Sequence, residues 1–366
     1  MAAGGRRGTA VFEAVPNFSE GRDDEVLADL AAGPDVLDVH TDADHHRSVV
    51  TLAHANLERL AEAVLEKVAV AVERIDLRRH AGVHPRVGAA DVVPIVPLGG
   101  ASMAEAVAAA RRLAERVWRE LRIAVYLYGD AAGGRRLADV RAGRVRPDLG
   151  GEPHPTAGAV CVGARPPLVA YNLAFEGLDL LQAARAVAAL RRLPGVQALA
   201  FRLGDGRVQL SMNLTRLDAT AVPAAHDAAL RLAGLPARPE LVGLCPAAAA
   251  GPGCDGGLLE ARLAGAAARG AAADALARGG GEMARLARRL DAEARALAAL
   301  PIAQDDLLDG AERAAALARV LRAAGLATAD REALLDCSAR GLRSALAAAT
   351  AGRFARRVAL LDRWLE

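Results

Sequence analysis

Aromatic side chains are scarce in this sequence, at 3% of 366 residues, so we expect leucine, valine and alanine to fill the core. Lysine is nearly absent: Lys67 is the only one, and arginine supplies the remaining basic residues. The formal net charge of +2 is too small to indicate a nucleic-acid or membrane partner, because either needs a concentrated basic surface. Such a general bias toward arginine also weakens any functional argument from arginine abundance alone.

Cysteine is rare and long apolar runs are missing. The four cysteines are widely spaced and match no CxxC metal or redox pattern, which favours reduced thiols in a cytoplasmic protein. No uncharged apolar run approaches the ~18 residues of a membrane span. Arg6 and Arg7 are not followed by the apolar segment of about 7 to 15 residues that a secretory signal needs.

Three common catalytic templates are also missing. The sequence has no G-x-S-x-G elbow, no G-x-x-x-x-G-K-[ST] phosphate loop and no G-x-G-x-x-G next to a predicted strand. The sequence therefore does not favour a serine hydrolase, a nucleotide hydrolase or a dinucleotide-dependent oxidoreductase.

Hydrophobic periodicity predicts an α/β (α+β) protein. In the first part, strands are predicted at 9–15, 35–40, 47–54, 91–98 and 123–129, with helices at 23–33, 56–75 and 103–120. After a glycine- and proline-rich loop at 142–158, the pattern predicts a strand at 168–175, a helix at 178–193, a hairpin turned by Gly204-Asp205-Gly206 and a helix ending near Gly234. We expect two small subdomains with mainly antiparallel sheets covered by helices, and a site between them.

Beyond Gly251 the strand signals vanish. One apolar stripe recurs at three- and four-residue steps, at Met283, Leu286, Leu290, Ala294, Leu297 and Leu300. Further helices are predicted at 305–324, 329–349 and 353–365. We therefore predict domains at 1–166, 167–250 and 251–366, the last an alanine-rich, all-helical bundle of unknown role.

Seven of the eight histidines lie in the first 154 residues, and this clustering favours catalysis over packing. Imidazole has the side-chain pKa closest to neutrality, which suits it to give and take protons. In "GVHPRVGAAD", Pro85 restricts the backbone of His84, so the ring should be held beside Arg86. An alternative is a metal-dependent hydrolase that uses the aspartates and histidines between Asp38 and His46. That run matches no recognised ligand spacing.

Eight ordered blocks resemble the glutamate formiminotransferase family. They are "VPNFSEGR", "LDVHTDADHHRSVVTL", "HAGVHPRVGAADVVPIVPL", "VYLYGDAA", "HPTAGAVCVGAR", "AYNL", "SMNLT" and "ELVGLCP", and together they span about residues 10–246. The resemblance implies a cytoplasmic homodimer that moves the formimino group from N-formimino-L-glutamate to tetrahydrofolate, a co-substrate, in histidine breakdown. It implies no metal, nucleic-acid or membrane partner.

The resemblance also implies site residues. His84 corresponds to the family's catalytic histidine, and we expect Arg86 to assist it by neutralising charge or gripping a carboxylate. Folate is expected to contact the loop of Gly150, Gly151, Glu152, Pro153, His154, Pro155, Thr156, Ala157 and Gly158. Candidate substrate-binding residues in matched blocks are Asn17, Arg22, His40, Arg47, Arg165 and Asn213.

Two departures from the family pattern keep alternatives open. His40 stands where some relatives carry an aspartate, so the residue that orients His84 is not identified. After "GLCP" the match stops, and the helical tail is too short for the complete cyclodeaminase that it faintly resembles. A non-catalytic folate-binding or assembly protein is therefore a second alternative.

Overall fold

The computed structural model describes residues 8–82, 85–346, 357 and 359–361. Tertiary contacts divide the chain into two compact units. The first unit is Ala10–Pro166, and the second contains the described residues from Pro167 onward together with Gly8 and Thr9. The predicted domains 1–166, 167–250 and 251–366 stay predictions.

The first unit is built on a seven-stranded mixed sheet. Two short strands, β1 (Ala10–Ala14) and β2 (Asn17–Phe18), follow one another. Both pair with β4 (Arg47–His54) on one side and β5 (Ala90–Gly99) on the other. β5, β7 and β6 run parallel, and the remaining pairings are antiparallel. Across the sheet the order is β3 (Val36–Asp42), β4 (Arg47–His54), β1 (Ala10–Ala14) with β2 (Asn17–Phe18), β5 (Ala90–Gly99), β7 (Ala159–Ala164) and β6 (Ala124–Gly129).

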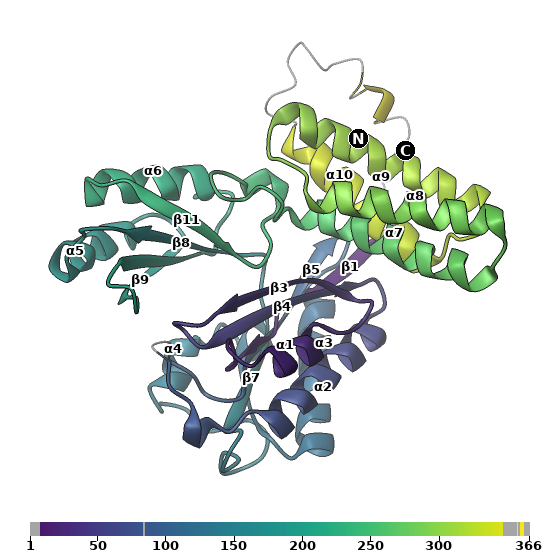
Figure 1. The fold of residues 1–366 in the computed structure, drawn as a ribbon. Helices are drawn as coiled ribbons and strands as arrows, with labels where there is room; N and C mark the ends of the chain where they lie inside the picture. The colour runs from purple at the N-terminus through teal and green to yellow at the C-terminus, as the bar shows by residue number, and fades with distance from the viewer. Residues whose placement is uncertain (1–7, 83–84, 347–356, 358, 362–366) are drawn as a thin grey trace, which may run out of the picture. The chain divides into compact units, whose positions relative to one another are not determined.

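Three helices share one hydrophobic core with this sheet (Figure 1). They are α1 (Asp24–Ala31), α2 (Leu57–Arg74) and α3 (Met103–Arg116), and α3 continues as a π-helical turn at Val117–Leu121. In α2 the Asn56 side chain caps the first amides, while Leu60, Val64 and Val68 recur every four residues and are fully buried. Side-chain spacing therefore sets which face of α2 meets the sheet.

A smaller cluster packs against the β5–β7–β6 part of the sheet. Val140, from the short helix α4 (Leu137–Arg141), contacts a group that includes Val92, Tyr128 and Cys161. Two 3₁₀ turns, Leu77–Arg79 and Asp130–Ala132, complete the connections of this unit.

A close crossing of two loops places the segment before β5. Gly88 and Gly158 form an isolated bridge, and the amide of Ala89 donates to the carbonyl of Ala157 at 2.8 Å. A Cβ atom added at Gly88 would lie 1.8 Å from the carbonyl oxygen of Ala159. Only glycine at 88 permits this backbone approach.

The second unit begins with a four-stranded antiparallel sheet in the order β11 (Ala237–Val242), β8 (Val169–Phe175), β10 (Val208–Leu214) and β9 (Val196–Arg202). One face, with Tyr171, Leu173 and Leu210, shares a core with α5 (Leu180–Leu190) and α6 (Val222–Ala233). β11 is an edge strand and contains Pro239. The alternation of apolar and polar residues in β8 and β10 produces a second face with different chemistry.

Up to residue 346, the described chain of this unit follows the sheet with the helices α7 (Leu259–Arg278), α8 (Gly281–Ala298), α9 (Gln304–Ala323) and α10 (Ala329–Ala345). They follow the 3₁₀ turn Ala247–Ala249. The α7 helix buries residues on all sides, most of them alanine, which is the pattern of a central helix. Leu290, Ala294, Leu297 and Leu300 of the predicted apolar stripe are buried, whereas Met283 and Leu286 are half-buried.

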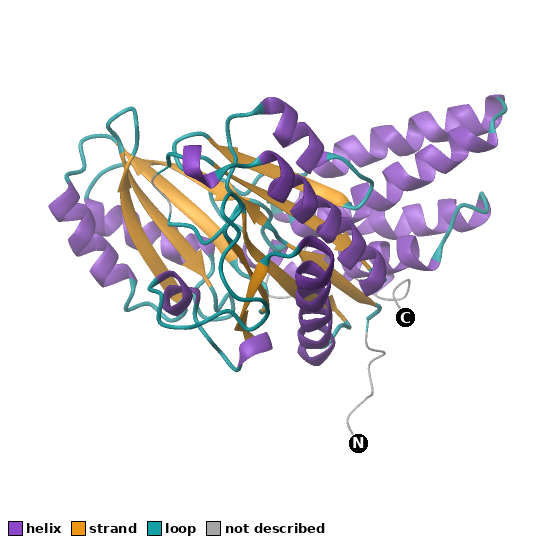
Figure 2. Cartoon of the chain, turned by 90° about the horizontal axis from the view of Figure 1, so that it is seen from below, coloured by secondary structure: helices purple, strands orange, loops and turns teal. Residues whose placement is uncertain are grey.

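The predicted fold class is confirmed: mixed sheets with helices are followed by a helical C-terminal region, and strands (orange in Figure 2) end at Val242 among the described residues. The strands β2, β7 and β11 and the helix α4 were not predicted from the hydrophobic periodicity. The predicted helix at 329–349 is present to Ala345, and most of the one predicted at 353–365 lies outside the described residues. No helix in the described part of the chain is long and apolar enough to cross a membrane.

The Gly88 crossing can be tested by adding one methyl group. We expect Gly88→Ala to lower the free energy of unfolding by at least about 1–3 kcal/mol, because overpacking against a backbone carbonyl forces the two loops apart. Gly151→Ala is the matched control, since nothing lies within 4 Å of a Cβ atom there. Urea unfolding of both variants measures the difference, and equal stability would contradict the crossing.

Candidate active site

A buried carboxylate, Asp91, lies where β5 begins, and three arginines surround it. Its Oδ2 accepts a hydrogen bond from Arg141 at 2.7 Å, and its Oδ1 accepts the amide of Val87 at 2.5 Å. Asp91 is 3% exposed, so its charge needs partners within the protein. Arg47 and Arg86 supply further positive charge nearby. We call Arg47, Arg86, Arg141 and Asp91 the arginine cluster.

Arg47 is the first residue of β4, and it brings a guanidinium into the protein. Its Nε has no access to solvent. Burial lowers the pKa of this guanidinium to about 10, against the opposing effect of Asp91, and the neighbouring Arg141 and Arg86 lower it further. The side chain remains protonated at neutral pH and concentrates positive charge at this end of the sheet.

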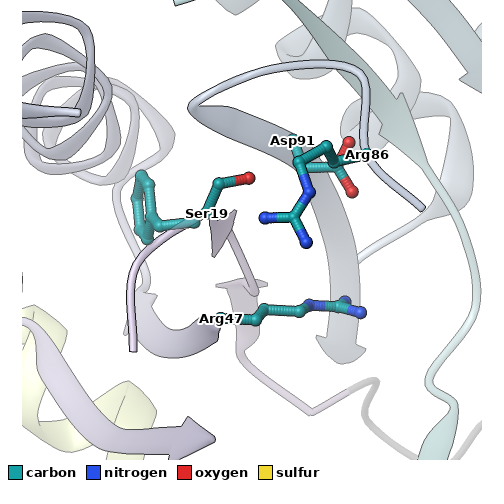
Figure 3. Close-up of a pocket in the computed structure, with 5 residues that line it drawn as sticks. Ser19, Arg47, Arg86 and Asp91 are labelled. Carbon is teal, nitrogen blue, oxygen red and sulfur yellow. The ribbon is translucent and has the colours of Figure 1, made fainter. Parts of the chain in front are cut away.

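A small cavity of about 10 Å³ lies within the arginine cluster, close to the space that one water molecule needs. Phe18, Ser19, Arg47, Arg86 and Asp91 line it, and they come from β2 and the residue after it, from β4, from β5 and from the loop before β5 (Figure 3). Ser19 is buried, and its hydroxyl donates to the carbonyl of Gly88 at 2.8 Å. The cavity therefore lies between separate strands of the sheet, and two guanidinium groups line it.

The loop before β5 is anchored on the turn between β3 and β4. Arg86 hydrogen-bonds the Nε2 of His80, and its Nη2 donates to the carbonyl of His45 at 3.4 Å. A Cβ atom at Gly82 would lie 2.5 Å from that same carbonyl. Gly82 and Arg86, which flank the predicted catalytic position in sequence, thus both contact the β3–β4 turn.

Two imidazoles stack beside this loop. The rings of His46 and His80 have centroids 4.1 Å apart, and the amide of Gly21 donates to Nδ1 of His46 at 3.2 Å. Burial lowers the pKa of both imidazoles, and Arg86 lowers both further, whereas Glu20 opposes the shift. Both rings are therefore held neutral near pH 7, and the positive charge of the site resides on guanidiniums.

Two residues of the segment from Asp38 to His46, Asp42 and His45, are hydrogen-bonded to each other within the β3–β4 turn. Asp42 accepts the Nδ1 of His45 at 2.7 Å and its amide at 2.8 Å. Burial alone would raise the pKa of Asp42, but these hydrogen bonds from His45 lower it. Within the described part of the chain, no group of three histidine, cysteine or acidic side chains is arranged to hold a metal ion.

The predicted folate loop is a tight turn. Nδ1 of His154 accepts the amide of Ala157 at 3.1 Å, and the backbones of His154 and Gly158 exchange two hydrogen bonds. The carbonyl of Thr156 accepts the amide of Leu77 at 2.8 Å. Through these bonds and the Gly88 crossing, residues 154–158 support the loop that carries Arg86, while Gly150, Gly151, Glu152 and Pro153 are exposed.

The remaining candidates are dispersed. Asn17 is buried and its Nδ2 donates to the carbonyl of Val15, and the exposed Arg22 donates from Nε to the carbonyl of Ala43, both at 2.8 Å. His40 is half-buried in β3, opposite Val49.

The last two candidates belong to other elements. Arg165 follows β7 and lies beside Tyr128, while Asn213 is exposed on β10 in the second unit. His84 lies outside the described residues, so its role stays a prediction, as do the roles of the other candidates.

Sequence reasoning missed four members of this site: Asp91, Arg141, His80 and Glu20. Asp91 had a recognisable signal, because a charged residue at the start of the fully buried strand "DVVPIVPL" needs an opposite charge. Arg141 had no recognisable signal in the sequence, because it lies on a five-residue helix that is far from Asp91 along the chain. Glu20 accepts hydrogen bonds from three successive backbone amides, those of Gly21, Arg22 and Asp23. The sequence pattern alone does not predict this turn.

Comparison with known proteins identifies the relatives of this chain. Residues 11–165 match the N-terminal subdomain of the formiminotransferase domain. A glutamate formimidoyltransferase of Thermoplasma acidophilum is 38% identical over 269 residues, which cover 65% of this chain and 88% of that protein. A glutamate formimidoyltransferase of Streptococcus pyogenes is 37% identical over 236 residues, 57% of this chain and 78% of the relative. The formimidoyltransferase-cyclodeaminase of Rattus norvegicus is 34% identical over 272 residues, 64% of this chain and 50% of that protein.

The lowered pKa values of His46 and His80 predict a pH-dependent stability. As the pH falls below the ordinary imidazole value of 6.5, the unfolded chain takes up protons before the folded chain does. The free energy of unfolding should therefore be highest above this pH and fall as the pH drops toward the folded-state values, with a slope of at most about 1.4 kcal/mol per pH unit for each group.

Substituting His46→Asn should flatten this pH dependence. Asparagine tolerates the left-handed backbone of this position, where φ is +48°, but it does not titrate. Urea unfolding between pH 8.5 and 5.5 gives the two curves. They should run parallel above pH 8, where the imidazole is neutral in both states, and an equal slope below pH 6.5 would contradict the assignment.

Proposed function

The chain belongs to the glutamate formimidoyltransferase family, and we propose that it transfers the formimino group of N-formimino-L-glutamate to tetrahydrofolate in histidine degradation. This proposal rests on the 38% identity to the archaeal glutamate formimidoyltransferase, which extends over 88% of the length of that protein. We further propose that the protein is a cytoplasmic homodimer and that tetrahydrofolate is a co-substrate. The reaction as written needs no metal ion.

The reaction requires one proton to leave a nitrogen and another to arrive. The amine of the reduced pterin attacks the carbon of the formimino group and forms a new C–N bond. It then loses a proton, and the C–N bond to glutamate breaks as the departing nitrogen gains one. A single imidazole with a pKa near neutrality performs both transfers in turn. In this proposal His84 is that residue, in line with the family resemblance.

The surroundings of the loop support this assignment. Gly82 and Arg86, each two residues from His84, both contact the carbonyl of His45. The neighbouring imidazoles of His46 and His80 are held neutral by burial and by nearby guanidiniums. A nearby positive charge favours the uncharged form of an imidazole, which is the form that accepts a proton.

The positive charge near this loop suits the substrates. Both substrates end in glutamate, so several carboxylates need cationic partners. Arg22 and Arg86 both lie close enough to His46 and His80 to lower the pKa of these imidazoles. Arg86 also lowers the pKa of Arg47. Guanidinium is the side-chain group best matched to a carboxylate, because it donates two parallel hydrogen bonds. We assign these arginines to substrate carboxylates, with the loop at 150–158 contacting folate.

The direct test is an assay with N-formimino-L-glutamate and tetrahydrofolate that follows the loss of the donor. Turnover with both substrates, and none when tetrahydrofolate is omitted, is the expected result. A protein that binds tetrahydrofolate without consuming the donor would instead be a non-catalytic folate-binding protein.

His84→Ala should reduce kcat by about 100-fold or more, the usual contribution of general acid–base catalysis. The affinity for tetrahydrofolate, measured by calorimetry, should change little, because the substitution removes only the proton carrier. Wild-type turnover in this variant would exclude His84 from the mechanism.

Arg86→Gln should act mainly on KM. Loss of one charge-assisted interaction of about 1.5–3 kcal/mol corresponds to a rise of roughly 10- to 100-fold in the KM of the substrate whose carboxylate it binds. Arg146→Gln is the control, since Arg146 is exposed in the same unit. Steady-state kinetics with each substrate varied in turn separates the two effects, and equal KM values in both variants would refute the role of Arg86.

A further inference from the structure

The sheet of the second unit has a polar face that the site described above does not use. Its other face is filled by Tyr171, Leu173 and Leu210 against α5 and α6. By register, β11, β8, β10 and β9 place one cross-strand row on the polar face, consisting of Glu240, Asn172, Ser211 and Leu199. The adjacent row consists of Arg238, Ala174, Gln209 and Phe201.

Two amide side chains hold the carboxylate of Glu240. Nδ2 of Asn172 donates to its Oε2 at 2.9 Å, and Nε2 of Gln209 donates to the same oxygen at 3.4 Å. Asn172 is 6% exposed and Gln209 is 3% exposed, so both amides are buried. Because a carboxylate only accepts, each amide must turn its NH₂ group toward Glu240. This requirement fixes the orientation of both amides.

The orientation leaves an acceptor inside the cluster. Oε1 of Gln209 is buried and has no hydrogen-bond partner among the described residues. A buried polar atom without a partner costs free energy, typically about 1–3 kcal/mol. The cluster thus presents an amide oxygen next to a carboxylate, and both are acceptors. A ligand that satisfies Oε1 of Gln209 must supply an N–H donor, and a second N–H on the same small group can reach the neighbouring carboxylate.

Small side chains lie along the central strand beside this cluster. β8 presents Ala170 and Ala174 on either side of Asn172 on this face. Ser211 is half-buried on the neighbouring strand, and Leu199 beyond it is 45% exposed. Small side chains beside the polar cluster and an exposed apolar side chain at its edge suit a planar ligand with one polar edge.

We infer that Glu240, Asn172 and Gln209 form a binding site for a planar N–C–N group, in which two nitrogens on one carbon present N–H donors to Glu240 and to Oε1 of Gln209. This inference rests on the proposed function, because both proposed substrates contain such a group. The 2-amino-pyrimidine edge of the pterin contains a cyclic one, and the formimino group contains an acyclic one. In this site Glu240 binds the ligand and Asn172 positions the carboxylate.

Calorimetry on the full chain tests the cyclic source directly. The ligands are tetrahydrofolate and an analogue in which a methyl group replaces the 2-amino group. Wild-type protein should bind the analogue at least about 10-fold more weakly. Glu240→Gln should weaken tetrahydrofolate binding by a similar factor and leave little further difference between the two ligands, because residue and ligand group belong to one interaction.

Steady-state kinetics tests whether the acyclic N–C–N group, the formimino group, occupies the site. If the formimino group occupies the site, Glu240→Gln raises the KM of N-formimino-L-glutamate at least about 10-fold while the affinity for tetrahydrofolate is unchanged. Glu176→Gln is the matched control, since Glu176 is exposed just after β8, and it should change neither value. Tetrahydrofolate affinity and donor KM both within twofold of wild type in a folded Glu240→Gln variant would overturn the inference.

Folding and function are controlled separately. Circular dichroism establishes that Glu240→Gln is folded, and if it is not, Gln209→Met is carried through the same measurements with the same criteria. Binding needs no turnover. Wild-type protein that binds tetrahydrofolate in a Glu240-dependent manner but consumes no donor would therefore contradict the proposed function alone.

Discussion

The carboxylate of Asp91 is the constraint on which the first unit's candidate site depends. It is buried at the start of β5 and hydrogen-bonds Arg141 from a helix distant in sequence. Without an opposite charge, buried guanidiniums such as that of Arg47 would be strongly disfavoured. One acidic side chain thus allows several cationic groups to gather where β2, β4 and β5 meet, and this gathering concentrates positive charge in the site.

The fold was predictable wherever periodicity was strong. The α2 helix occurs within one residue of its predicted limits, because a single face of it is buried. The β4 strand also has its predicted limits, although its six central residues are all buried, because its sequence is rich in β-forming residues. The misses have local causes. β2 has only two residues, and β7 is buried along its whole length, so it does not alternate. β11 contains Pro239, a residue that argues against a strand unless the strand lies at an edge.

The candidate site was predictable only through residues that family motifs or chemistry single out. Arg47 and Arg86 were selected in this way, and they do line one cavity. Asp91 and His80 lay within the same matched block, yet no periodicity distinguishes a charge-balancing residue from its neighbours. The cluster around Glu240 joins three strands, and its members are 31 to 68 residues apart, so only strand pairing brings them together.

Pro239 has a consequence for association between molecules. The outer edge of β11 would otherwise present a full row of backbone donors and acceptors to another strand. Proline has no amide hydrogen to offer, so this border is a poor template for sheet extension. A chain with abundant apolar residues thereby limits one route to aggregation through the placement of a single imino acid.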